Sequence, residues 1–461
     1  MSALMQQREF GAKAAIHAAT LVTALLTIPV GVAACDWKGV SAEAVFPIEP
    51  NIGGRYLQDA AGRPFLMIGD SPWSLIADLT REDAEIYLKD RQSRGFNTLL
   101  VNLIEHKFTM DAPANAYGER PFVGDHAFSK PNEAYFDHAA WVLERACDLG
   151  FLVLLAPAYA GYGGGDHGWY TAMVEAGPDR LRSYGRFLGR RFGNLANIVW
   201  VHGGDYDPPD KELVRAIVAG IEETAAEAIH TAHGAPETRL LDYWIDEPWL
   251  AINNVYTYGH VHAAALEQFR RHGDRPFFFM EGAYENEFGA GGERVRMQAY
   301  QALLSGASGQ LFGNNPIWHF DGPGLHPSPT GWQEQLDSPG ARSMSVLADL
   351  FSTVEWWRLE PDLSDSLLRS GHGRARSRAV AALANDGSFG LVYIPSRRVI
   401  RLDTGGFSTG RVHLSWLDPA TGEITAVAGS PVEQRQFRIR SPGPNGARDT
   451  DWVLVLQADA D

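Results

Sequence analysis

Asn197-Ile-Val-Trp-Val-His-Gly-Gly-Asp205 joins a short apolar run to two glycines and a carboxylate. The β-branched and aromatic residues at 198–201 favour a buried strand, and the glycines allow the chain to leave it tightly. An acid in this place either caps the following turn or lies at the floor of a site. The stretch supports both interpretations, so the segments on either side of it are needed to choose between them.

Similar apolar runs recur between residues 64 and 358, and amphipathic segments follow most of them. Further strands are predicted at residues 64–69, 97–104, 151–157, 249–256, 275–281 and 309–313, with the fifth at either 227–232 or 240–243. Helices are predicted at residues 80–94, 134–149, 179–192, 212–229, 294–304 and 338–356. Eight such βα steps indicate the α/β class, as a (β/α)8 TIM barrel over residues 64–358 rather than an open doubly wound sheet. No GxGxxG fingerprint follows the first strand, which also disfavours a dinucleotide-binding fold.

The segments that flank the predicted barrel have a different character. Short β-rich runs separated by turn signals predict a C-terminal all-β sandwich over residues 362–461. Residues 36–63 are predicted to form a lead-in hairpin. Residues 1–35 have the pattern of an export signal peptide, in which Arg8 and Lys13 precede an apolar run too short and too interrupted for a good membrane span.

The end of this leader, Val32-Ala-Ala-Cys35, also resembles a bacterial lipoprotein box. Two alternatives are open: lipidation of Cys35, which would anchor the protein to a membrane, and cleavage at a small-residue site with Cys35 incidental. Either alternative predicts an exported protein in the periplasm, at the cell envelope or outside the cell. The second cysteine, Cys147, falls inside a predicted helix, where we expect a buried and unreactive thiol.

Composition excludes some classes of partner. The chain has 461 residues and a formal net charge of −16. Nucleic acid is not an expected partner, because phosphate binding needs a basic surface. The histidines show no HExxH or comparable spacing, so we expect no metal site and no other cofactor.

Two acids directly end predicted barrel strands, at the edge where barrel active sites are built. Asp205 follows the fourth strand and Glu281 ends the seventh. Hydrolysis of a glycosidic bond uses two carboxyls, one as proton donor and one as nucleophile or water-activating base. By analogy with many sugar-cleaving barrels, Asp205 is the predicted general acid/base and Glu281 the predicted nucleophile or base. Glu285 is the rival acid, and a structural role in a turn or an ion pair is the alternative for each.

Other side chains near these strand ends are predicted to contact sugar. Aromatic rings pack against the flat faces of sugars, while carboxylate and imidazole groups bond to hydroxyls. The predicted substrate-binding residues are Asp70, Trp73, Trp169, His202, Tyr258, His260 and Trp318. Capping is the alternative for Asp70, and core packing is the alternative for the tryptophans.

Several motifs, taken together, resemble the apiosidase-like glycoside hydrolases. The motifs are Pro64-Phe-Leu-Met-Ile-Gly-Asp-Ser-Pro-Trp73, the 197–205 stretch, Asp246-Glu-Pro-Trp249 and Glu281-Gly-Ala-Tyr-Glu285, in this order. Trp416-Leu-Asp-Pro-Ala-Thr-Gly422 resembles the β-sandwich that follows this barrel, a domain labelled as a collagen-binding domain of a collagenase.

This resemblance covers about residues 50–457. It implies a (β/α)8 hydrolase whose catalytic Asp and Glu correspond to Asp205 and Glu281, with Asp70 and His202 in the sugar pocket. The segment 231–238 departs from the family's fifth-strand pattern. Members of the family differ in substrate, so apiose specificity does not follow.

The leading functional prediction is an exported glycoside hydrolase that acts on an oligo- or polysaccharide of plant or microbial origin. The alternative is a non-catalytic carbohydrate- or matrix-binding protein on a degenerate barrel, with the sandwich as its adhesive part. A collagen-degrading peptidase ranks third, because the sequence has neither a metalloprotease motif nor a GxSxG elbow.

Overall fold

The computed structural model describes residues 44–51, 53–271 and 275–459. The predicted signal segment and Cys35 lie outside these ranges. No helix in the described part of the chain is both long enough and apolar enough to cross a membrane.

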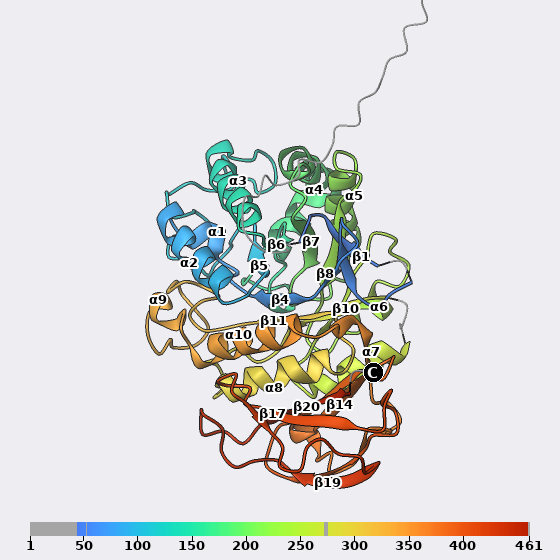
Figure 1. The fold of residues 1–461 in the computed structure, drawn as a ribbon. Helices are drawn as coiled ribbons and strands as arrows, with labels where there is room; N and C mark the ends of the chain where they lie inside the picture. Colours follow the sequence, from blue (N-terminus) through green and yellow to red (C-terminus); the bar gives the residue numbers. More distant parts are fainter. Residues whose placement is uncertain (1–43, 52, 272–274, 460–461) are drawn as a thin grey trace, which may run out of the picture. The chain divides into compact units, whose positions relative to one another are not determined.

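Eight parallel strands form a barrel around which the helices are arranged (Figure 1). In their order around the barrel the strands are β4 (Met67–Asp70), β5 (Thr98–Asn102), β6 (Leu152–Ala156), β7 (Ile198–Gly203), β8 (Ile229–His233), β9 (Asn253–Tyr256), β10 (Phe277–Glu281) and β11 (Gly309–Phe312). Between β8 and β9 closure is minimal, with one parallel bridge from His230 to Leu250. The nearly closed (β/α)8 architecture confirms the predicted fold class.

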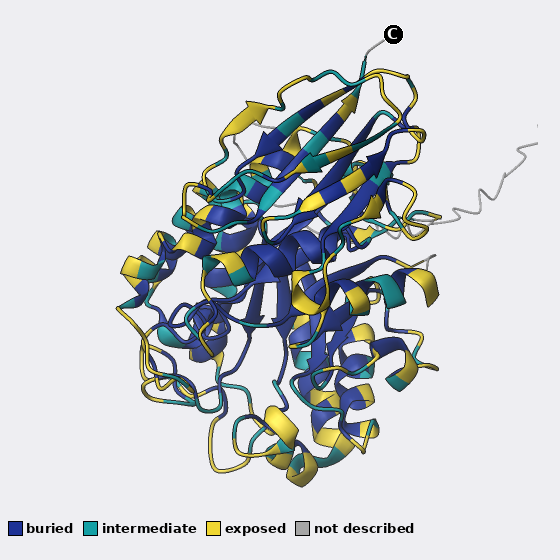
Figure 2. Ribbon diagram, turned by 90° about the horizontal axis from the view of Figure 1, so that it is seen from below, coloured by how far each residue is buried: buried dark blue, intermediate teal, exposed yellow. Residues whose placement is uncertain are grey.

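The barrel helices cover the strands on the outside. The longer ones are α2 (Arg81–Ser93), α3 (Glu133–Asp148), α4 (Tyr170–Phe192), α5 (Glu212–Glu222), α7 (Val261–Arg271), α8 (Gly292–Leu303) and α10 (Pro339–Ser352), and the short ones are α1 (Leu75–Asp78), α6 (Leu240–Tyr243) and α9 (Trp332–Gln335). Thr80 caps α2 by accepting a hydrogen bond from the Asp83 amide at 3.2 Å. Figure 2 shows the buried residues gathered along the barrel strands and between the C-terminal sheets.

Three of the predicted boundaries need correction. The helix predicted at residues 212–229 ends at Glu222. The fifth strand is β8, and residues 240–243, the other candidate, form the helix α6. Polar residues in β8 obscured its pattern, since His230, Thr231 and His233 interrupt the apolar run. The helix predicted at residues 179–192 begins at Tyr170 and contains a kink at Gly177, whose φ is 71°.

Antiparallel sheets precede and follow the barrel. The lead-in contains β1 (Ile48–Pro50), β2 (Leu57–Asp59) and β3 (Pro64–Phe65). The larger C-terminal sheet contains, in spatial order, β12 (Leu359–Pro361), β14 (Val380–Ala384), β15 (Phe389–Ile394), β20 (Trp452–Ala458), β17 (Val412–Leu417) and β18 (Ile424–Ala426). The smaller one contains β13 (Leu368–Ser370), β16 (Val399–Asp403) and β19 (Gln436–Arg440). Both sheets contribute side chains to one apolar core, as the predicted sandwich requires.

A buried ion pair joins the barrel to the sandwich. Arg296 on α8 is 1% exposed and donates to both carboxylate oxygens of Asp451, at 2.8 and 3.0 Å. It also donates to Asp449 at 2.7 Å. The Tyr393 hydroxyl donates to Asp451 at 2.9 Å, and its ring stacks on Tyr300 with centroids 4.9 Å apart. Breaking such a buried pair from one side is costly, so the contact fixes α8 against the sandwich.

Cys147 corrects one further prediction. It lies in α3 and is 3% exposed, as the helical pattern indicates, but it is disulfide-bonded. The expectation of a free, unreactive thiol is therefore wrong. Helical periodicity predicts the burial of a cysteine and carries no information about its oxidation state.

Candidate active site

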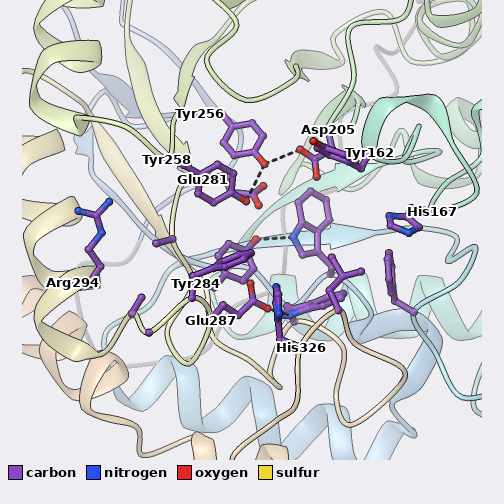
Figure 3. A pocket seen from close by; sticks show the side chains of 18 of the residues that line it. Tyr162, His167, Asp205, Tyr256, Tyr258, Glu281, Tyr284, Glu287, Arg294 and His326 are labelled. Atoms are coloured by element: carbon purple, nitrogen blue, oxygen red, sulfur yellow. Dashed lines mark hydrogen bonds between the residues drawn. The ribbon is translucent and has the colours of Figure 1, made fainter. Parts of the chain in front are cut away.

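A cavity of about 830 Å³ opens at the carboxyl ends of the barrel strands. Asp205 and Glu281 both line it, as do Trp73, Tyr258 and Trp318 from the predicted substrate-binding set (Figure 3). Trp73, Asp205, Tyr258 and Trp318 follow the strands β4, β7, β9 and β11, respectively, and Glu281 is the last residue of β10. The structure therefore brings both predicted catalytic acids and three predicted aromatic contacts to one site.

The turn that carries Asp205 depends on its two glycines. Gly203 and Gly204 have φ values of 86° and 124°, which glycine adopts without steric cost. A Cβ on Gly203 would lie 2.6 Å from the His233 carbonyl oxygen, and one on Gly204 would lie 2.3 Å from the Tyr159 ring. Asp205 itself has a φ of 54°, in a left-handed conformation that aspartate tolerates better than most residues. The chain thus turns within two residues of β7, and Asp205 reaches the cavity.

Two tyrosine hydroxyls hold the Asp205 carboxyl. Tyr256 donates to one carboxyl oxygen at 2.7 Å, and Tyr159 donates to the other at 3.1 Å. The Tyr256 hydroxyl is also 3.2 Å from that of Tyr258. Burial, with the nearby carboxylates adding to it, raises the pKa of Tyr159 and of Tyr256, so both keep their protons. A hydroxyl both donates and accepts, so these partners suit the ionised and the protonated states of Asp205.

His233, at the end of β8, connects the two acids. Its Nδ1 accepts a hydrogen bond of 2.7 Å from the Asp205 amide, which places the ring proton on Nε2. Nε2 then donates to the Glu281 carboxyl at 2.8 Å. Burial raises the pKa of Glu281, the hydrogen bond from His233 opposes this, and the charge of Asp205 adds to it. His233 was absent from the predicted site, although its place at the end of the fifth strand would have indicated it once that strand was located.

The tryptophans form two walls of the cavity. Trp73 donates from Nε1 to the Tyr284 hydroxyl at 2.8 Å and meets the Tyr159 and His233 rings at centroid distances of 5.6 Å. Trp318 donates from Nε1 to Glu287 at 2.9 Å. These bonds fix the orientation of each indole ring, so the walls are largely preformed.

Two predicted sugar contacts are buried away from the cavity lining. Asp70 is fully buried and pairs with Arg91 at 2.5 Å and Tyr87 at 2.8 Å, both on α2. His202 is 1% exposed and its Nε2 lies 2.8 Å from Nδ1 of His230. Burial and the adjacent His230 lower the pKa of His202, which keeps it neutral. Side chains alternate across a strand, and the Asp70 side chain faces the helix layer.

Trp169 and His260 also lie outside the cavity lining. Trp169 is 5% exposed, packs against Phe122 and Phe128, and donates to the Ile104 carbonyl at 3.3 Å. Core packing, the alternative for this tryptophan, is what the structure shows. His260 is exposed and directly precedes α7, where its ring stacks on that of His262.

Glu285, the rival acid, has a structural role. It is 1% exposed and accepts hydrogen bonds from the Ser338 hydroxyl at 2.6 Å and the Gly340 amide at 2.7 Å, at the start of α10. Asn314 adds a third bond at 2.9 Å. The carboxylate thus anchors the N-terminus of α10, a favourable place for a negative charge, and does not line the cavity.

Several lining residues were not predicted. They are Asn102, Phe108, Tyr159, Tyr162, His167, Tyr256, Ala283, Tyr284, Glu287, Phe288, Gly289, Ala290, Arg294, Leu325, His326 and Arg376. Burial raises the pKa of Glu287, and the bond from Trp318 opposes this shift. Among the described residues, no three or more His, Cys, Asp or Glu side chains are grouped to hold a metal ion.

Two family models match the chain. Residues 51–358, more than half of the 461, match a model described as "Apiosidase-like, catalytic domain". Residues 361–457 match a model described as "Putative collagen-binding domain of a collagenase".

Several solved structures with a similar fold are glycoside hydrolases. One, described as a glycoside hydrolase, is 22% identical with a TM-score of 0.77, and the match covers 90% of this chain and 97% of that one. A family 5 glycoside hydrolase from Bacteroides vulgatus is 21% identical with a TM-score of 0.78, over 90% of this chain and 94% of that one. At these identities the likeness is one of fold. No curated protein matches the chain.

Replacing Gly204 tests the tight turn that carries Asp205. We expect Gly204→Ala to lower the free energy of unfolding by about 2–4 kcal/mol, from the unfavourable φ and the collision with Tyr159. Gly62→Ala is the control, because Gly62 has a φ of 76° and open space around its Cβ position. For Gly62→Ala the free energy of unfolding should fall only by the cost of the unfavourable φ, about 1–2 kcal/mol. Denaturant unfolding measures both, and equal losses would contradict a steric role for Gly204.

Proposed function

Since this chain belongs to the apiosidase-like family of glycoside hydrolases, we propose that it cleaves its carbohydrate substrate with Asp205 as general acid/base and Glu281 as nucleophile or base. One observation carries this assignment: the two carboxyls line one cavity and His233 links them. The proposed substrate is an oligo- or polysaccharide of plant or microbial origin.

In the acid step, Asp205 gives its proton to the glycosidic oxygen as the bond to the leaving sugar breaks. The left-handed turn at the end of β7 supports this role because it directs Asp205 into the cavity. As the carboxyl loses its proton, Tyr159 and Tyr256 donate to the new charge. In the reverse transfer, the hydroxyl next to the reprotonated oxygen accepts from it, while the other continues to donate.

Glu281 acts in its ionised form, on the opposite side of the reacting carbon. As a nucleophile it would form a glycosyl-enzyme intermediate with retention of configuration, and as a base it would activate water with inversion. The Nε2 proton of His233 is donated to the charged carboxyl, which favours the ionised form and fixes its orientation. Nδ1 of the ring is occupied by the Asp205 amide, so the ring proton stays on Nε2 and is directed at Glu281.

Aromatic side chains supply the sugar contacts in this proposal. Trp73, Trp318 and the partly exposed Tyr258 line the cavity beside the acids, where their faces can pack against sugar rings. Because Trp73 and Trp318 are already held by hydrogen bonds to Tyr284 and Glu287, binding orders few side chains.

Substitution of the acids tests the assignment. Against a panel of plant and bacterial glycans, wild type should release sugar. We expect Asp205→Asn to lower kcat by about 10²- to 10⁴-fold for substrates with poor leaving groups, and Glu281→Gln to lose at least as much. Glu334→Gln, an exposed change on α9, is the control and should retain full activity.

Proton NMR of the first anomer released distinguishes retention from inversion. Full activity in Glu281→Gln would remove it from the mechanism. A wild-type protein that binds glycans but releases no sugar from any of them would instead favour a carbohydrate-binding function.

The pH profile tests the role of His233. Activity needs ionised Glu281, whose pKa burial raises, so kcat/KM should fall as the pH drops through that raised pKa. In His233→Met the opposing hydrogen bond is lost, the pKa of Glu281 rises further, and the acidic limb should move to higher pH. His233→Gln, which can still donate, should move it less. A purely structural role predicts lower activity in both variants with an unmoved limb, and that result would contradict the proposal.

Export to the periplasm, the cell envelope or the medium is part of the proposal. The composition of residues 1–35 supports it, and so does the disulfide at Cys147, because disulfides persist in oxidising compartments. Lipidation of Cys35 is the form of export that would anchor the protein to a membrane. Because the chain has only two cysteines, lipidation would leave Cys147 without a disulfide partner in the same chain, so the disulfide supports the unlipidated form. Cell fractionation and mass spectrometry of the N-terminus should find a cleaved or lipidated chain outside the cytosol. An uncleaved chain in the cytosol would contradict export.

A further inference from the structure

Two arginines from different domains line the same cavity as the acids. Arg294 lies in the first turn of α8, and Arg376 lies in the short helix η3 (Ala375–Ser377) of the sandwich. In Figure 3, Arg294 stands to one side of the cavity, beyond Tyr258 and Glu281 as seen from His167. The cavity wall is therefore built from both domains.

The guanidinium of Arg294 has no partner within the described part of the chain. Among residues 44–51, 53–271 and 275–459, none forms a hydrogen bond or an ion pair with its side chain. Burial lowers its pKa to about 10, and the charge of Arg376 contributes to this shift. The first turn of a helix is also an unfavourable place for a cation. Arg296, two residues further along α8, is by contrast fully paired with Asp449 and Asp451.

Arg376 is held in place by contacts along its backbone. Gln301, which is 1% exposed, donates hydrogen bonds of 2.9 Å to the carbonyls of Arg376 and Arg378. Gln301 follows Arg294 by seven residues on α8, so both side chains lie on one face of the helix. The Arg376 guanidinium donates to the Tyr258 carbonyl at 3.3 Å, and this hydrogen bond connects the side chain to the barrel. One helix thus positions both cations.

The two cations in the cavity contrast with the negative charge of the whole protein. The net charge is −16, and Asp205, Glu281 and Glu287 add acids to the cavity itself. Charges beyond about 8 Å are largely screened at physiological ionic strength, so nearby arginines have the largest effect on the affinity for an anion. Guanidinium groups bind carboxylates and other oxyanions through paired, charge-assisted hydrogen bonds. A ligand anion would supply the partner that Arg294 lacks among the described residues.

We propose that Arg294 and Arg376 form a subsite for an anionic substituent, a carboxylate or a sulfate, on a sugar bound beside the catalytic acids. The hydrolase then acts on an acidic glycan. This inference rests on the proposed function for the identity of the substrate as a glycan, while the anion subsite stands on the two arginines alone.

Binding of simple sugars tests the subsite without any bond cleavage. The probes are D-glucuronate, its methyl ester, D-glucose 6-sulfate and D-glucose, titrated into the full-length protein with ligand-observed NMR. Wild type should bind glucuronate, glucose 6-sulfate or both at least about tenfold more tightly than the two neutral sugars. The preferred anion identifies the substituent as carboxylate or sulfate. Added salt should weaken only the anionic probes.

Arginine variants identify the groups responsible. Arg294→Gln and Arg376→Gln should each weaken binding of the preferred anion by about tenfold and leave the neutral sugars unchanged. Arg374→Gln removes an equal charge from an exposed residue of the same loop that does not line the cavity, and it should change nothing. Thermal unfolding confirms that each variant is folded.

Three results would overturn the subsite: no detectable binding of either anionic sugar, equal affinity for anionic and neutral sugars, or the same affinities in wild type and both variants. Because the probes are not hydrolysed, these results are independent of the glycan panel. Anion binding without glycan hydrolysis would support the subsite and contradict the catalytic assignment. Glycan hydrolysis without a preference for anionic sugars would support the catalytic assignment and contradict the subsite.

Discussion

The imidazole ring of His233 connects two strand ends that the barrel alone would leave independent. Its Nδ1 accepts from the backbone of Asp205, and its Nε2 donates to the side chain of Glu281. Both bonds together require one tautomer and one ring orientation. The backbone of the same residue shapes the turn, since its carbonyl accepts from the Gly204 amide at 2.8 Å. Movement of the end of β8 would therefore displace both acids at once, and much of the geometry of the cavity depends on this residue.

The barrel could be predicted because its strands are buried on both faces. Parallel barrel strands appear as short continuous apolar runs, and β5, β6 and β10 have this pattern. β8 has histidines and a threonine among its buried residues, and Thr231 and His233 bond to groups inside the protein, so the pattern of the strand resembled that of a loop. The acids near the ends of β7 and β10 were found for the same reason as the strands, because Glu281 ends one apolar run and Asp205 follows another after a short glycine turn.

Side-chain direction accounts for most of the differences between the predicted and the observed cavity. Asp70 lies at the end of β4, much as Asp205 lies just after β7. The side chain of Asp70, however, contacts Arg91 on the helix side of the barrel. Local sequence does not reveal this, because a shift of one residue along a strand reverses the face. Glu287 and Arg294 follow β10 on a loop and a helix whose path depends on contacts with distant segments. Arg376 comes from another domain, and no pattern near it indicates a cavity.

The contact between the domains has a geometric role as well as an energetic one. A buried ion pair such as Arg296–Asp451 adds little net stability compared with well-packed apolar residues, yet it permits few relative orientations of the two surfaces. Gln301, on the same helix, then binds the loop that carries Arg376. α8 therefore sets the angle of the sandwich and the position of a cavity residue together.

Because Arg376 lines the cavity, the division of the chain at residues 358–361 separates two domains without separating the site. Recombination between relatives at this junction would exchange one wall of the cavity along with the tail. In this chain the tail therefore contributes to the cavity that holds the predicted catalytic acids. A gene that acquires a new sandwich also acquires different side chains beside its old catalytic acids, so domain shuffling offers a route to altered substrate preference in which no barrel residue mutates.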